Sequence, residues 1–94
     1  MACYFIANIA IEDDEVYRKY LDEAADVFDR FNGTYLAVDD APVVLEGSWD
    51  YTRVVVIRFD TPADFRAWYD SPDYRRIREF RLAASRCDTI LVSD

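Results

Sequence analysis

Strand-like and helix-like segments alternate along this 94-residue chain in an order that few folds accommodate. Residues 3–11 and 53–59 are rich in β-branched and aromatic residues, which favours β-strands. Each is followed by a segment in which apolar residues recur every three or four positions, as on one face of a helix. Residues 34–38 and 88–92 add two more strands. The order β-α-β-β-α-β predicts one antiparallel sheet with both helices on one face.

Short polar signals delimit the predicted helices. Asp13 is a suitable N-cap for the first helix, and Gly33 is expected to end that helix in the left-handed conformation. Thr61-Pro62 begins the second helix, and Ser71-Pro72 repeats the signal, so the second helix should break and restart. Residues 43–47 are expected to be extended, either continuing the second strand after a kink or forming a short strand.

The strands are apolar on both faces, which predicts an assembly. Val55 and Ile57 point to one side of their strand, whereas Val54 and Val56 point to the other. Two helices cover only one face of such a sheet, and an uncovered apolar face invites a second copy of the chain. We therefore expect an α+β, ferredoxin-like single domain over residues 1–94, paired as a homodimer through its sheet face.

Charge and composition exclude several classes of function. Nineteen acidic and eleven basic residues give a net charge of −8, which disfavours nucleic-acid and membrane partners. The chain has no histidine, so Ser-His-Asp and Cys-His catalysis and most zinc sites are excluded. We expect no metal and no cofactor.

The two cysteines, Cys3 and Cys87, do not have the spacing of metal ligands. The predicted topology places them at opposite ends of neighbouring antiparallel strands, so free thiols are expected rather than a disulfide. The sequence also has no recognisable signal peptide and no long apolar run. Together these features predict a cytoplasmic protein without a membrane span.

Four stretches of the chain resemble one known family. They are Gly-Thr-Tyr-Leu at 33–36, Leu-Glu-Gly-Ser-Trp at 45–49, the strand at 53–59, and Trp-Tyr-Asp-Ser-Pro-Asp-Tyr at 68–74. Together they resemble domain of unknown function 1330, a family of the dimeric α+β barrel superfamily. The resemblance implies a homodimer packed sheet face to sheet face and no agreed reaction, because the family is defined by the absence of one. Its superfamily includes cofactor-free monooxygenases, muconolactone-isomerase-like and dehydratase-like enzymes, and ligand-binding modules.

The chain departs from this family in one loop that bears on ligand binding. The family often has Arg-Gly-Gly after the second strand, where this chain has Val38-Asp39-Asp40. A basic, flexible loop has therefore become acidic. If the family's arginine binds an anion, Arg53 or Arg81 must do so here.

Two arginines are the leading candidates for binding an anion. Arg53 begins the most apolar strand, where its guanidinium could clamp a carboxylate or enolate, or else pair with Glu46 or another acidic residue. Arg81 falls at an inward-facing position of the second helix, so it needs a partner. That partner is a carboxylate of the protein, main-chain carbonyls or an anion of a ligand. Glu46 is the best-placed carboxylate for a general base, unless an arginine neutralises it.

Aromatic and amide side chains complete the candidate site. Tyr69 and Tyr74 flank the helix break and either line a pocket or belong to the core, while Ser71 is suited to capping the restarted helix. Tyr35 and Trp49 are expected near a sheet edge, on the opposite wall of the same cleft. The lone amide of Asn8 needs hydrogen-bond partners in the sheet, across the dimer or on a ligand. The candidate ligand-binding residues are Asn8, Tyr35, Trp49, Arg53, Tyr69, Ser71, Tyr74 and Arg81.

Three functions are compatible with these residues. The first is a module that binds a small, anionic or aromatic metabolite between helices and sheet. The second is a cofactor-independent oxygenase, isomerase or lyase in which Arg53 or Arg81 stabilises an oxyanion. The third is a structural or interaction subunit. A closed, polar-lined pocket beside the two arginines favours the first two, whereas a cleft filled by Trp68, Tyr69 and Phe80 favours the third.

Overall fold

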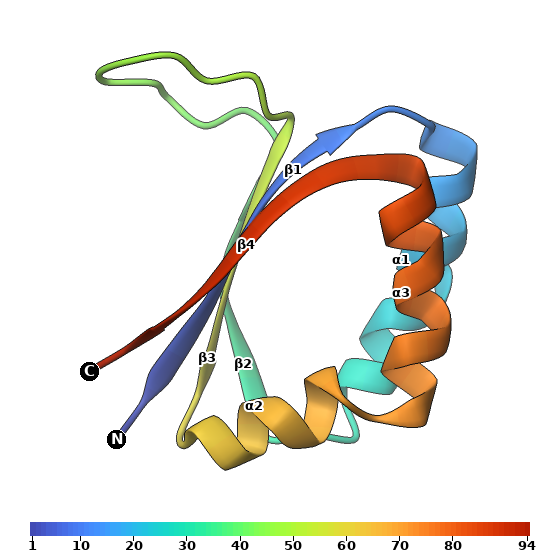
Figure 1. Cartoon of the computed structure of the whole chain (residues 1–94), viewed down its shortest axis with the longest axis vertical. Helices are drawn as coiled ribbons and strands as arrows, with labels where there is room; N and C mark the ends of the chain where they lie inside the picture. The colour runs from blue at the N-terminus through green and yellow to red at the C-terminus, as the bar shows by residue number, and fades with distance from the viewer.

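Four strands form one antiparallel sheet in the spatial order β2-β3-β1-β4, and three helices lie on one side of it (Figure 1). The computed structural model describes residues 1–94. The predicted ferredoxin-like α+β fold with a broken second helix is confirmed. The elements are β1 (Cys3–Ile11), α1 (Asp14–Phe28), β2 (Gly33–Asp39), β3 (Arg53–Phe59), α2 (Pro62–Tyr69), α3 (Pro72–Ala84) and β4 (Ser85–Ser93).

Side-chain caps begin all three helices, as predicted from the sequence. Asp13 Oδ1 accepts a hydrogen bond from Val16 N at 3.1 Å. Thr61 caps α2 in the same way, and Ser71 Oγ accepts from Tyr74 N at 3.1 Å while donating to the carbonyl of Trp68 at 2.8 Å. Ser71 therefore ends α2 and begins α3 with the same hydroxyl, which positions Tyr74 at the first turn of α3.

The core lies between the sheet and the helices and is dominated by aromatic rings. Trp68 of α2 is 2% exposed, and its ring centroid lies 5.6 Å from those of Phe5 and Phe59 on the two central strands. It also lies 4.1 Å from the ring of Tyr74 on α3. Trp68 thus joins the helix break to the centre of the sheet, and burial of this large ring stabilises both.

The prediction that Gly33 ends the first helix in the left-handed conformation is wrong. The helix ends at Phe28, and Gly33 is already the first residue of β2, without a positive φ. Gly33 is required by packing instead. A Cβ atom there would lie 2.5 Å from Phe28 Cζ and 2.7 Å from Phe59 Cε1. The two rings close over the backbone at this point, so the position has no room for a side chain.

We expect Gly33→Ala to lower the free energy of unfolding by about 1–3 kcal/mol, as for other overpacked sites. Gly47→Ala is the matched control, because Gly47 has a φ of 83° but no atom near an added Cβ. Its cost is limited to backbone strain of about 1 kcal/mol. Urea unfolding of both variants measures the difference, and equal losses would contradict the packing role of Gly33.

Residues 43–47 form no strand, contrary to the sequence-based expectation. After β2, Ala41 N donates to Asp39 Oδ1 at 2.8 Å, and this Asx turn with the following Pro42 directs the chain away from the sheet. Residues 40–52 form an arm that projects on the side of the sheet opposite the helices (Figure 1). The arm returns at Thr52, whose amide donates to the carbonyl of Ile9 at 2.8 Å.

No helix covers the outer face of the sheet (Figure 1). Its exposed apolar side chains include Ile90 and Val92 of β4, which are 60% and 42% exposed. Together with the arm, this face holds a groove of about 480 Å³. The groove is lined by Ala37, Asp39, Pro42, Val43, Val44, Leu45, Glu46, Trp49 and Val54.

The cysteines are placed as predicted. Cys3 pairs in register with Ser93 and Cys87 with Ile9, at opposite ends of β1, and both thiols are free. None of the helices has the length and apolar character needed to cross a bilayer. The cytoplasmic location stays a prediction.

Candidate ligand-binding site

A small cavity of about 40 Å³ lies between the helices and the sheet. This volume exceeds the roughly 10–15 Å³ needed for one water and suits a few waters or one polar group of a ligand. Its walls are mainly apolar and aromatic. The lining residues are Phe5, Ala7, Ile9, Tyr17, Tyr20, Leu21, Ala24, Tyr35, Arg53, Val55, Ile57, Trp68, Tyr74 and Arg81.

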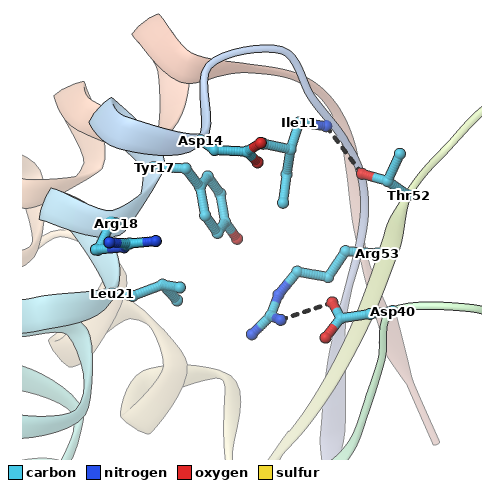
Figure 2. A pocket seen from close by; sticks show the side chains of 8 residues that line it. All are labelled: Ile11, Asp14, Tyr17, Arg18, Leu21, Asp40, Thr52 and Arg53. Carbon is cyan, nitrogen blue, oxygen red and sulfur yellow. Dashed lines mark hydrogen bonds and ion pairs between the residues drawn. The ribbon is translucent and has the colours of Figure 1, made fainter.

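A wider cleft of about 550 Å³ lies beside this cavity, between α1 and the strand ends (Figure 2). Tyr17, Leu21 and Arg53 line both spaces, so the cavity adjoins the cleft directly. Figure 2 shows Tyr17 and Leu21 pointing from α1 toward Arg53. The cleft is lined by Ile11, Asp14, Tyr17, Arg18, Leu21, Asp40, Thr52 and Arg53.

Arg81 is the most unusual residue of the site. It is 3% exposed, it forms no ion pair, and its Nε and Nη1 have no hydrogen-bond partner. Arg53 Nε and Trp68 Nε1 are also buried without a partner. Four of the five such nitrogens in the protein therefore belong to residues that line this one cavity. All four are donors, and buried donors are costly unless an acceptor meets them.

Arg53 connects the cavity with the cleft. Its side chain is only 16% exposed, and its Nη1 donates to Asp40 Oδ1 at 2.8 Å (Figure 2). Its Cζ lies 5.9 Å from the ring centroid of Tyr17, within the range of a cation–π contact. Arg53 thus pairs with an acidic residue, as one of the two sequence-based alternatives predicts, and that residue is Asp40 rather than Glu46.

Three tyrosine hydroxyls add neutral polar groups to the cavity. Tyr20 of α1 and Tyr74 of α3 share a hydrogen bond of 2.8 Å between their hydroxyl oxygens. Burial raises the pKa of Tyr17 to about 12, although the charges of Arg53 and Arg81 oppose the shift. Burial also raises the pKa values of Tyr20 and Tyr74. All three are neutral phenols near pH 7, able to exchange hydrogen bonds but not to act as bases.

The raised pKa of Tyr17 predicts a loss of stability at alkaline pH. The neutral phenol stabilises the fold fully below its ordinary pKa of 10.0, and this contribution disappears as pH rises through about 12. Between about pH 8 and 11.5, wild type should lose about 2 kcal/mol more free energy of unfolding than Tyr17→Phe. Urea unfolding of both proteins across this pH range measures the difference in their free energies of unfolding. An equally steep loss in Tyr17→Phe would contradict the assignment.

The structure brings four of the predicted site residues together. Tyr35, Arg53, Tyr74 and Arg81 all line the cavity. Ser71 does not line it but caps α3 at Tyr74. Tyr69 lies outside, stacked on Phe65 at 5.1 Å.

Two predicted residues lie elsewhere. Asn8 pairs in register with Val54 and Asp88, and its side chain belongs to the outer face of the sheet. Trp49 lies in the arm, where its ring contacts Tyr51 at 5.0 Å. The expectation that Trp49 forms a wall of the same cleft as Tyr35 is wrong, because the arm projects away from the helices.

In the sequence, Tyr17 and Tyr20 belong to the apolar residues that recur at helical spacing after residues 3–11, and this spacing alone does not mark them as site residues. The signal that distinguishes them is the phenol itself, because a buried hydroxyl needs a hydrogen-bond partner where leucine would need none. Asp40 was noted as a loop residue, and nothing local in the sequence indicates that it meets Arg53.

The sequence of residues 2–94 matches the family model described as domain of unknown function, DUF1330. The chain belongs to the DUF1330 family. The resemblance inferred from the four sequence stretches is thereby confirmed. No curated protein sequence matches this DUF1330 protein at a significant level.

Solved structures with the same fold add context for this DUF1330 protein. RPA0582 of Rhodopseudomonas palustris, a protein of unknown function, matches with a TM-score of 0.83 and 19% identity, covering 99% of this chain and 82% of its own. A dimeric ferredoxin-like protein from Jannaschia sp. CCS1 matches with a TM-score of 0.75 and 12% identity over the whole of both chains. SnoaB of Streptomyces nogalater, a cofactor-independent oxygenase, matches with a TM-score of 0.70 and 15% identity. The match covers 99% of this chain and 92% of the SnoaB chain.

Proposed function

We propose that this protein binds a small molecule through an anionic oxygen group, a carboxylate or an enolate, held in the inner cavity. Four donor nitrogens without a partner belong to Arg53, Trp68 and Arg81, which all line this one cavity, and this clustering supports the function. A buried guanidinium without a carboxylate partner is matched best by an acceptor of opposite charge.

The sizes of the two spaces define the ligand further. The cavity of about 40 Å³ holds a single head group but no aromatic ring. The cleft of about 550 Å³ lies within the usual range for small-molecule sites and has room for the remaining part of the ligand. Ile11, Tyr17 and Leu21 give that part of the cleft an apolar wall. A monocarboxylate with a small apolar or aromatic body fits this description.

Benzoate and benzamide test the proposal because they share a ring and differ in the charge of the head group. Benzoate should raise the midpoint of thermal unfolding in a concentration-dependent manner, whereas benzamide at equal concentration should not. Native mass spectrometry of freshly purified protein adds an unbiased measurement, since a reproducible mass excess identifies the ligand directly. Equal effects of benzoate and benzamide would contradict an anion site.

Catalysis without a cofactor is the second candidate function. A guanidinium beside neutral phenols is suited to stabilising an enolate, and SnoaB of similar fold is a cofactor-independent oxygenase. However, no carboxylate lines the inner cavity, and its tyrosines are held in the neutral form by burial. A substrate would have to enter already ionised. Binding therefore accounts for the residues with fewer assumptions, and a purely structural subunit would not require the cavity.

We also propose that the protein forms a homodimer through the outer face of its sheet. That face carries exposed apolar side chains on its strands and on the arm. The similar structure from Jannaschia sp. CCS1 is described as dimeric, which supports the same assembly here. The ligand site lies on the opposite, helix-covered side, so each protomer would hold its own site.

A further inference from the structure

Arg53 has two possible partners at once. Its Nη1 is bound to Asp40 in the cleft, whereas its buried Nε has no partner and its side chain lines the inner cavity. A guanidinium clamps an anion best with two parallel N–H donors. An anion in the cavity therefore attracts the same group that Asp40 holds.

Asp40 begins the arm and is 67% exposed. Within its first limb, residues 40–46, the contact with Arg53 is the only hydrogen bond or ion pair to another part of the chain, apart from the local turn bond from Ala41 to Asp39. The limb otherwise exposes apolar side chains, with Val43 84% and Leu45 88% exposed. A single ion pair thus ties this limb to the ligand-binding side.

The second limb of the arm, residues 47–52, is fixed more firmly. Thr52 binds β1 through its amide and also accepts from Ile11 N at 3.0 Å. Asp50 forms an ion pair with Arg86 at 2.9 Å, and the Tyr51 hydroxyl donates to Asp88. Loss of one contact will therefore free the first limb while the second stays in place.

We propose that Asp40 competes with the bound anion for Arg53, so that ligand binding releases the first limb of the arm. This inference rests on the proposed anion site. It makes Asp40 a residue that sets ligand affinity, and it links the helix side of the sheet to the arm on the outer face. Asp40→Asn should raise the affinity for benzoate about 2- to 5-fold, the effect expected of a partly exposed ion pair.

The two tryptophans allow both events to be observed in one experiment. Trp68 lines the cavity, and Trp49 lines the outer groove together with Val43 and Leu45 of the first limb. Labelling with 5-fluorotryptophan therefore gives one ¹⁹F resonance for each region. Trp49→Phe assigns the two signals. In wild type, titration with benzoate should shift both resonances with the same midpoint. In Asp40→Asn without benzoate, the Trp49 resonance should already lie where saturating benzoate places it in wild type, because the first limb no longer packs beside Trp49.

Asp50→Asn is the matched control, because Asp50 is also an arm carboxylate paired with an arginine but does not contact Arg53. Its benzoate affinity should equal that of wild type. If Trp68 responds to benzoate while Trp49 does not, and Asp40→Asn binds no more tightly, the competition is disproved and the anion site stands. If benzoate moves neither resonance, the anion site itself is contradicted and this inference fails with it.

Discussion

Replacing Arg81 by methionine is expected to abolish benzoate binding and at the same time to make the protein more stable. Methionine keeps much of the buried volume but removes a charge whose Nε and Nη1 have no partner. Buried charged groups replaced by well-packed apolar side chains often raise the free energy of unfolding by about 1–4 kcal/mol. Loss of the guanidinium should weaken binding by at least about 30-fold, since truncating a buried charge partner costs about 2–5 kcal/mol.

Arg78→Met is the control for this experiment. Arg78 also lies on α3 and also has a buried Nε without a partner. However, its Cζ lies 4.5 Å from the centroid of the Tyr69 ring, and Arg78 does not line the cavity. It should retain benzoate binding. Calorimetric titration and urea unfolding measure both properties. If Arg81→Met keeps binding, or loses several kcal/mol of stability, Arg81 is structural and the proposed site is wrong.

Ile90→Asp is expected to convert the proposed homodimer into a monomer. Ile90 lies on the outer face of β4 and is 60% exposed in the single chain, so the fold of the protomer tolerates a polar side chain there. In a sheet-to-sheet dimer the twofold axis introduces two buried carboxylates, each without a partner. We expect the dissociation constant of the dimer to rise by at least about 100-fold, the equivalent of about 3 kcal/mol.

Sedimentation velocity at micromolar concentration measures this change. Leu82→Asp is the control, because Leu82 is similarly exposed, at 51%, but lies on α3, away from the outer face of the sheet. It should leave the dimer intact. A wild-type protein that sediments as an 11.0 kDa monomer would contradict the assembly outright. Dissociation by Leu82→Asp but not Ile90→Asp would place the interface on the helices instead.

The two predicted effects concern opposite sides of the same sheet. Arg81 lies on the helix-covered side and Ile90 on the outer side, so the variants should act independently. Arg53 is the exception, because it lines the cavity and holds the first residue of the arm. Under the proposed competition, Arg53 is the residue through which ligand binding influences the outer face.

Local sequence signals were sufficient wherever neighbouring residues decide the structure. The bounds of β1 and β3 follow from runs of β-branched and aromatic residues, and the caps of all three helices follow from Asp13, Thr61 and Ser71. The excess of apolar side chains over what two helices can cover also identified the outer face. These features depend on a residue's own preferences and those within about four positions of it.

The site depended on contacts between distant residues. Tyr20 and Tyr74 are 54 positions apart and meet through one hydrogen bond, and Arg53 finds Asp40 only because the chain turns after β2. At Gly33, too, packing against the rings of Phe28 and the distant Phe59, and not the conformation of the glycine, excludes a side chain.

The sequence by itself therefore determined the order of the elements, the absence of histidine chemistry and the two-sided sheet. Only the tertiary structure decided which buried arginine forms no ion pair, where the arm projects and which phenols surround the cavity. The physical reason is that secondary structure reflects preferences of consecutive residues. A binding site, in contrast, reflects the burial and pairing of groups that become neighbours only when the chain has folded.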